Sequence, residues 1–160
     1  MEKKLFILMI FLSSFIYAQE TVLTINVTKA FIGKIIDDKP VFSGAYDNDE
    51  TIKQIISIEK KEGFLTFKNS MKAQNTFSHG PINEIIYESP NKDELSTQFT
   101  WQFSNSYDDN KGIAYIDIIM VKKKLADKNK IFTAVILIEL DNSITQYEGY
   151  INSKDFIKIQ

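Results

Sequence analysis

Two carboxylates, Asp117 and Glu139, come closer to a catalytic pair than any other side chains in this sequence. Each stands within a run of apolar residues, where a charged side chain is unusual. Facing carboxylates have pKa values that are driven apart, as acid–base and glycosidic chemistry require. The strand pairing predicted below places both on one face of a sheet, diagonally related, with Tyr115 near Glu139. The alternative is that both mark the solvent side of that sheet, since paired carboxylates without a cleft are a weak signal of an enzyme.

Aromatic residues at alternate positions form a candidate ligand site. Phe99, Trp101 and Phe103 alternate with polar residues, and Tyr147 is predicted to share their face. Aromatic side chains of this kind line pockets for apolar ligands, and they also build ordinary cores. Both interpretations stay open at this point.

The acid–amide segment Asp47-Asn48-Asp49-Glu50 is the candidate metal site. Oxygen-rich clusters can hold calcium outside the cytoplasm, and Asp47, Asp49 and Glu50 would supply the ligands. The segment lacks the twelve-residue EF-hand spacing and consists of ordinary turn formers. A turn without metal is therefore the simpler interpretation.

Composition excludes several other chemistries. The single histidine, His79, follows Ser78 directly, so in an extended chain the two side chains point to opposite faces. We interpret His79 as a loop residue before a Gly-Pro turn. The sequence contains no Cys and no Arg. Thiol catalysis, cysteine-ligated zinc, disulfides and bidentate arginine recognition are therefore excluded, and we expect no cofactor.

The first 18 residues have the features of a cleavable signal peptide. Lys3 and Lys4 form a positive start, a mostly apolar run from 5 to 17 follows, and Ala18 is a small residue at the expected cleavage point. We therefore expect an exported, periplasmic or secreted chain, with a single domain over residues 19–160. The whole chain has 21 acids and 19 lysines, and residues 1–18 contain one acid and two lysines. The mature chain would therefore have 20 acids and 17 lysines, a net charge of −3, which argues against nucleic-acid binding. No later segment is apolar and long enough to form a membrane-spanning helix.

The elements that would position these residues are predominantly β-strands. The C-terminal half predicts a four-stranded antiparallel meander over 95–105, 112–122, 131–140 and 143–151, separated by polar turns. Pairing through each turn sets Phe99 near Ile118. It also sets Ile116 opposite Ile138 and Ile118 opposite Ile136. One apolar face then contains Phe99, Trp101, Phe103, Ile116, Ile118, Met120, Phe132, Ile136, Ile138, Leu140 and Tyr147.

The N-terminal half has weaker signals. Strands are predicted over 23–27, 41–46, 52–58, 64–68 and 82–88, although Asp49 before Ile52 also fits the start of a short helix. The fold class is therefore all-β, a single antiparallel domain of about eight strands. It forms either an up-and-down barrel or a sandwich.

Three functions fit these patterns. The first, favoured because no convincing catalytic set is present, is a non-enzymatic exported module that binds a small molecule or a protein, with an apolar ligand one form of it. The second is a hydrolase that uses Asp117 and Glu139. The third is a small outer-membrane β-barrel, for which alternation is the expected signature but many strands are short.

Overall fold

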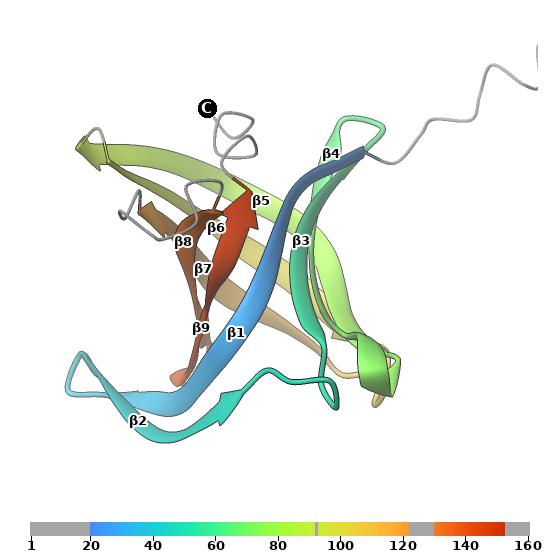
Figure 1. Ribbon diagram of the computed structural model, residues 1–160, viewed down its shortest axis with the longest axis vertical. Coiled ribbons are helices and arrows are strands. Elements are labelled where there is room, and N and C mark those ends of the chain that lie inside the picture. Colours follow the sequence, from blue (N-terminus) through green and yellow to red (C-terminus); the bar gives the residue numbers. More distant parts are fainter. Residues whose placement is uncertain (1–19, 92, 122–129, 153–160) are drawn as a thin grey trace, which may run out of the picture.

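The computed structural model of the protein describes residues 20–91, 93–121 and 130–152; the expected signal peptide lies outside these ranges. Within them, nine β-strands and one short 3₁₀ helix surround a common interior (Figure 1). The elements are β1 (Glu20–Ile36), β2 (Lys39–Asp47), β3 (Gln54–Lys61), β4 (Phe64–Met71), η1 (Lys72–Gln74), β5 (Thr76–Asn91), β6 (Glu94–Asn105), β7 (Lys111–Val121), β8 (Lys130–Glu139) and β9 (Ser143–Asn152).

Eight of these strands close into an antiparallel up-and-down barrel, which decides between the two predicted architectures. Strands β3 to β9 pair in chain order, and β1 completes the ring because it pairs with both β3 and β9. The 17-residue length of β1 allows an additional pairing. Its first half pairs with β3, and its second half pairs on the same edge with β2, the one strand outside the ring. The β1–β2 hairpin consequently extends beyond the barrel wall (Figure 1).

The barrel interior is filled by alternate side chains from the strands. In β7, for example, Ala114, Ile116 and every second residue up to position 120 are buried, while their neighbours are more exposed. Phe67 contacts two aromatic rings across the interior, with centroid distances of 4.9 Å to Trp101 and 5.6 Å to Phe99. The period-two pattern therefore produces a packed core rather than an open channel.

A bulge in β1 changes which of its residues face inward. The pairing of β1 with β9 shifts by one residue at Thr28; odd-numbered residues are buried before this point and Ala30 is buried after it. One extra residue reverses the facing of a strand because its side-chain period is two. Gly149 lies opposite this bulge, and a Cβ there would be 2.2 Å from the carbonyl oxygen of Asn26. The close approach of the two backbones requires glycine.

The predicted register between β7 and β8 is wrong by one residue. Ile116 lies opposite Leu137 and Ile118 lies opposite Val135, not opposite Ile138 and Ile136. Because β8 is apolar on both faces, its hydrophobic pattern does not determine which face is buried. The corrected inward set of β8 comprises Ile131, Thr133, Val135, Leu137 and Glu139.

The register correction removes four residues from the predicted apolar face. Ile136 and Ile138 lie on the outer face of the barrel, and Phe132 pairs there with Tyr150 at a ring-centroid distance of 6.3 Å. Leu140 follows the end of β8 and is 65% exposed. In contrast, the β6–β7 pairing differs from the prediction by two residues, Phe99 lying opposite Ile116. A shift of two residues leaves both inward faces unchanged.

Two local predictions in the N-terminal half also change. The strand expected from 52 begins at Gln54, because residues 49–53 form a turn in which the amide N–H of Lys53 donates to the carbonyl of Asp49. His79 lies within β5, opposite Lys68, rather than in a loop. Its ring contacts Phe77 with a centroid distance of 5.3 Å, and its side chain is exposed on the outer wall.

Candidate ligand-binding site

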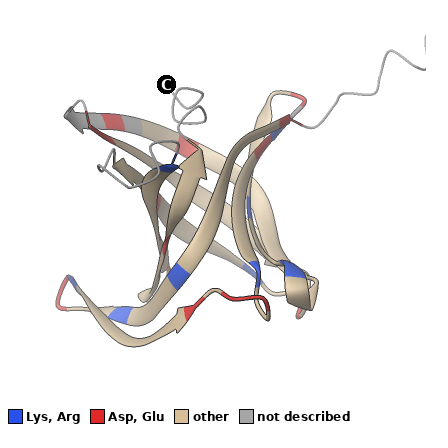
Figure 2. Ribbon diagram, viewed as in Figure 1, with Lys and Arg blue, Asp and Glu red and all other residues tan. Residues whose placement is uncertain are grey.

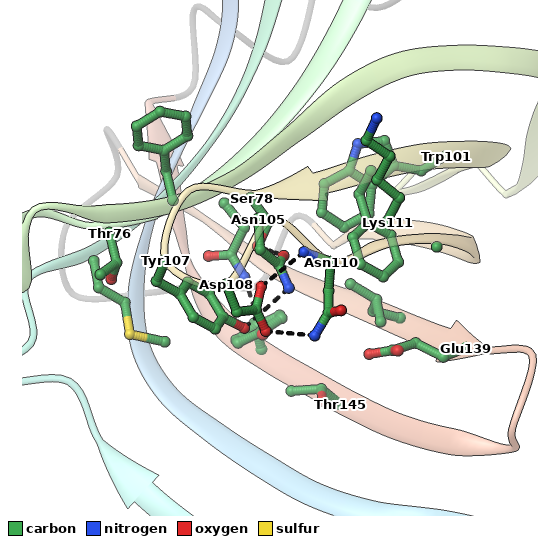
Figure 3. A pocket seen from close by; sticks show the side chains of 17 residues that line it. Thr76, Ser78, Trp101, Asn105, Tyr107, Asp108, Asn110, Lys111, Glu139 and Thr145 are labelled. Atoms are coloured by element: carbon green, nitrogen blue, oxygen red, sulfur yellow. Dashed lines mark hydrogen bonds between the residues drawn. The ribbon is translucent and has the colours of Figure 1, made fainter.

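A cavity of about 440 Å³ opens at one end of the barrel, where the β4–β5, β6–β7 and β8–β9 connections lie. We call it the mouth cavity; strands β4 to β9 and the β6–β7 connection line it. Trp101, Leu137 and Tyr147 are buried and form its floor, whereas Tyr107 and Asp108 on the connection are exposed at its rim. Figure 3 shows the side chains of this lining, which is mixed polar and apolar. A volume of this size suits a small molecule.

A chain of hydrogen bonds crosses the interior beside the floor. The Tyr46 hydroxyl donates to Gln54 Oε1 at 3.0 Å, Gln54 Nε2 donates to Asn69 Oδ1 at 2.8 Å, and Asn69 Nδ2 donates to the Tyr147 hydroxyl at 3.1 Å. These four side chains come from β2, β3, β4 and β9. Gln54 is only 1% exposed, so both of its amide atoms depend on these partners. The chain therefore fixes the polar side of the floor.

Asn48 holds this chain against the backbone. Its Nδ2 donates to the carbonyl oxygens of Val27 at 2.6 Å and Gln54 at 3.1 Å, and its Oδ1 accepts the Gln54 amide N–H at 2.7 Å. The β2–β3 connection is thereby tied to β1 beside its bulge and to the start of β3. Burial raises the pKa of Tyr147 far above its ordinary value, and the nearby Tyr46 acts in the same direction. Tyr147 is therefore a neutral hydroxyl in the floor at physiological pH.

The rim is organised by hydrogen bonds within and beside the β6–β7 connection. Ser78 Oγ donates to Asn105 Oδ1 at 2.5 Å, and Asn105 Nδ2 donates to the Tyr107 hydroxyl at 3.1 Å. Asn110 donates to both carboxylate oxygens of Asp108, from its backbone N–H at 3.1 Å and from Nδ2 at 2.7 Å. Desolvation raises the pKa of Asp108, but hydrogen bonds, chiefly those from Asn110, together lower it by more. The pKa of Asp108 is therefore below its usual value. Asp108 is therefore ionised at the rim.

Glu139 extends from the end of β8 into the same cavity, and its side chain is half-buried. Figure 3 shows its carboxylate pointing toward Asn110 and Asp108 on the β6–β7 connection. Burial, with a smaller contribution from the charge of Asp141, raises the pKa of Glu139. Among the described residues its carboxylate has no hydrogen bond and no ion pair.

Trp101 contributes a second polar atom without a partner. Its side chain is 2% exposed, and the indole Nε1–H has no hydrogen-bond acceptor among the described residues. Phe103 covers one side of the indole, with a ring-centroid distance of 4.9 Å. A buried donor of this kind is uncommon, because native structures pair nearly all such groups.

The structure brings together three of the four predicted aromatic residues. Trp101, Phe103 and Tyr147 line the mouth cavity. Phe99 is buried deeper in the barrel, where its ring contacts Phe67. The predicted aromatic face therefore combines a core residue with three residues of a candidate site.

The predicted pairing of Asp117 with Glu139 is wrong. Because the β7–β8 register differs by one residue, Glu139 faces the mouth cavity whereas Asp117 lies on the outer wall. Asp117 accepts a hydrogen bond from Ser96 Oγ at 2.6 Å and borders a separate outer depression of about 360 Å³. Tyr115 borders that depression too, so it lies on the opposite face of the wall from Glu139. No shared site contains both carboxylates.

The candidate metal ligands form an ordinary turn. Asp49 Oδ1 accepts hydrogen bonds from the backbone N–H and the hydroxyl of Thr51, at 2.8 and 2.6 Å. Glu50 forms an ion pair with Lys53 at 2.5 Å, and Asp47 ends β2. Asp49 and Glu50 lie in the connection between β2 and β3, just after Asp47 (Figure 2). In the part of the chain that the structure describes, no group of three or more His, Cys, Asp or Glu side chains is placed to hold a metal ion.

Sequence reasoning did not identify the polar residues of the floor or the rim. Gln54 and Asn69 interrupt the inward-facing apolar pattern of β3 and β4, which is a usable signal once the strand boundaries are known. Asn105, Tyr107 and Asn110 belong to a segment rich in turn formers, where no pattern separates a binding residue from a turn residue.

Comparisons with known proteins add no relative: no protein-family model matches the chain, and neither the curated proteins nor the solved structures give a match. No helix in the described ranges is long and apolar enough to cross a membrane. The functional interpretation consequently depends on the geometry of the mouth cavity.

Proposed function

We propose that this protein is a non-enzymatic, exported binding domain that holds a small amphiphilic ligand in the mouth cavity. The observation that carries the proposal is the cavity itself, which combines a buried aromatic floor with a polar rim. Binding sites for small molecules commonly have this form, with a few placed polar groups that orient the ligand. The partner is therefore a small molecule, and the rest of the barrel acts as a rigid support.

The packed interior determines where such a ligand would lie. Phe67, Ile116 and Ile118 are at most 2% exposed and belong to the core that occupies the centre of the barrel. An apolar ligand enclosed between the strands would have to displace this core. A ligand at the mouth would instead contact the floor through its apolar part and the rim through its polar part.

The same observations favour binding over the two alternative functions. The hydrolase hypothesis required Asp117 and Glu139 to share a site, and the structure places them on opposite sides of the barrel wall. A transmembrane barrel presents its apolar residues outward. Here the buried core faces inward, and β6 directs polar residues such as Gln98 and Gln102 toward the outside. The outer wall is therefore not a continuous apolar band, although β8 carries Ile136 and Ile138 there.

The single tryptophan of the chain provides a direct test, because Trp101 lies in the cavity floor. Protein purified from its own host would be examined by native mass spectrometry for a bound small molecule. Tryptophan fluorescence would then follow rebinding of that molecule, or binding of compounds from a metabolite library. We expect a saturable change in emission.

A matched pair of variants assigns this signal to the cavity. Thr145 lines the cavity, whereas its neighbour Gln146 lies on the other face of β9. Thr145→Phe fills the cavity and should weaken binding at least about tenfold, while Gln146→Phe should leave it unchanged. The proposal fails if the protein is empty and no compound changes its fluorescence, or if Thr145→Phe binds as tightly as the wild type.

Export is the second part of the proposal and depends on residues 1–18. Their positive start, apolar run and small residue at position 18 support removal during export. The mass of the protein recovered from its host tests this directly. A mature chain beginning at or next to Gln19 supports export, and a chain that retains the first 18 residues contradicts it.

A further inference from the structure

The mouth cavity carries an excess of negative charge. Among its described lining residues, Asp108 and Glu139 are acids and Lys111 is the single cation. Burial raises the pKa of Tyr107, and the charges of Asp108 and Glu139 raise it further. The hydroxyl of Tyr107 therefore lies in the electrostatic field of both acids. The two carboxylates therefore act on one region at the rim.

Lys111 does not neutralise this region. It forms no ion pair with Asp108 or Glu139 among the described residues. Lys111 also borders a depression on the outer wall, together with His79, so it stands at the edge between the two surfaces. Within the described ranges, the acidic part of the cavity thus has no lysine as an ion-pair partner.

The unpaired state of Glu139 indicates what a ligand could supply. A half-buried carboxylate loses part of its hydration, and a nearby positive charge offsets that loss more effectively than a neutral hydrogen-bond donor. Asp108 differs because Asn110 already satisfies both of its oxygens. Glu139 is therefore the primary partner for a ligand cation, and Asp108 adds to the field.

Aromatic side chains also line the cavity. Phe103 and Tyr107 border it, and the buried Trp101 forms part of its floor. Aromatic faces supply apolar contacts and attract organic cations. The lining therefore suits a ligand that joins a positive charge to an apolar group.

We propose that the mouth cavity selects a small organic ammonium compound that also carries an aromatic or other apolar group. Glu139 holds the ammonium group with Asp108 nearby, and the aromatic side chains of the lining contact the apolar group. The proposal rests on the proposed function, because it names the ligand class of the same cavity. It gives the unpaired carboxylate of Glu139 a partner.

Three related compounds test the selection for charge. 2-Amino-1-phenylethanol has an ammonium group, a hydroxyl and an aromatic ring; 1-phenyl-1,2-ethanediol is its neutral analogue, and mandelate is an anionic one. Binding to the full-length purified protein would be measured by isothermal calorimetry and by Trp101 fluorescence. We expect the amine to bind at least about tenfold more tightly than either analogue, which is the order of one charge-assisted hydrogen bond.

Glu139→Gln should reduce the affinity for the amine to that for the diol while leaving the diol unchanged. The control is Asp141→Asn, an acid-to-amide change on the neighbouring turn; Asp141 is exposed, lies outside the cavity and accepts hydrogen bonds from Ser143. This control should keep the preference for the amine. Thermal unfolding of both variants would verify that they are folded.

The inference is overturned if the amine does not bind at millimolar concentration, if the diol or mandelate binds as tightly, or if Glu139→Gln keeps the preference. These outcomes leave the proposed function standing, because that proposal is tested with the host-derived ligand and Thr145→Phe.

Discussion

The two ends of the barrel interior are built by the same strands from different residues. In β3, Gln54 lies at the mouth and Ile58 toward the opposite end; in β9, Thr145 lies at the mouth and Ile151 toward the opposite end. The end away from the mouth is packed with apolar side chains, whereas the mouth end contains a hydrogen-bonded chain, a half-buried carboxylate and a cavity. One set of strands thus supports two kinds of interior.

This difference separates stability from function along the barrel axis. Apolar burial supplies most of the favourable free energy of folding, and polar groups in a partly open cavity add little or reduce it. Natural proteins often accept such a cost where a binding site is needed. We therefore expect substitutions in the packed end to change stability strongly, and substitutions in the mouth to change it less and to affect binding.

Ile116→Ala should have the largest effect on stability. Ile116 is 2% exposed in the packed core below the mouth cavity, so its truncation removes buried methyl groups and leaves a void. We expect a loss of about 2–5 kcal/mol in the free energy of unfolding, measured by urea denaturation. The control on the same strand is Ile113→Ala, since Ile113 is 37% exposed and should cost less than about 1 kcal/mol. Equal losses at both positions would contradict the described burial.

Gln54→Leu should have an intermediate effect, because it breaks the hydrogen-bonded chain at the mouth end. The hydroxyl of Tyr46 and the Oδ1 atom of Asn69 would lose their partners. We expect a loss of about 1–3 kcal/mol, partly offset by the added apolar contacts. Gln146→Leu on the outer face should cost less than about 0.5 kcal/mol. A Gln54→Leu variant that is more stable than the wild type would show that this chain is not needed for folding.

The sequence pattern was informative where one face of a strand is apolar and the other is polar. Strand β6 alternates in this way around Trp101, and its inward face was predicted correctly despite a two-residue shift in register. The barrel closure was not predictable from the pattern, because it depends on the two halves of β1 pairing with three different strands. Alternation defines faces, whereas closure depends on long-range pairing that no local signal encodes.

Part of the candidate site could be predicted, but the sequence patterns behind the prediction do not describe how its residues are arranged in the structure. Trp101 and Tyr147 were identified from alternation alone, which does not distinguish a cavity floor from a core. Glu139 is predicted as half of a carboxylate pair, but it lies in the cavity without Asp117. The pairing fails because β8 is apolar on both faces, so its sequence does not determine its register. The unpaired indole N–H is a property of three-dimensional packing, and no spacing in the sequence indicates it.

Glu139→Gln should have the smallest effect on stability, and its pH dependence is the informative quantity. Burial raises the pKa of Glu139 in the folded state, so the folded protein favours the protonated carboxyl. The stabilisation that protonation of Glu139 provides is complete below the pKa of the unfolded chain. It is lost as the pH rises through the raised pKa of the folded state. Above both values the wild type carries the cost of a half-buried charge, which glutamine avoids. At pH 7 the variant should therefore be more stable, by less than about 1 kcal/mol because solvent screens the group.

Asp141→Asn should show the opposite sign and gives the control for this measurement. Hydrogen bonds from Ser143, and the charge of Lys34, lower the pKa of Asp141 in the folded state. Its contribution is present above the unfolded pKa and is lost as the pH falls through the lowered value. Urea denaturation from pH 3 to pH 8 would compare both variants with the wild type.

The acids and tyrosines that face Glu139 are Asp108, Asp141, Tyr107 and Tyr147, and Lys111 is the cation of the cavity. Because the two tyrosines stay neutral over this pH range and the other groups remain in both proteins, the difference between Glu139→Gln and the wild type isolates one carboxylate. A variant that is less stable than the wild type at pH 7 would mean that Glu139 already has a stabilising partner, and the mouth cavity would then have no unpaired acid to offer a ligand.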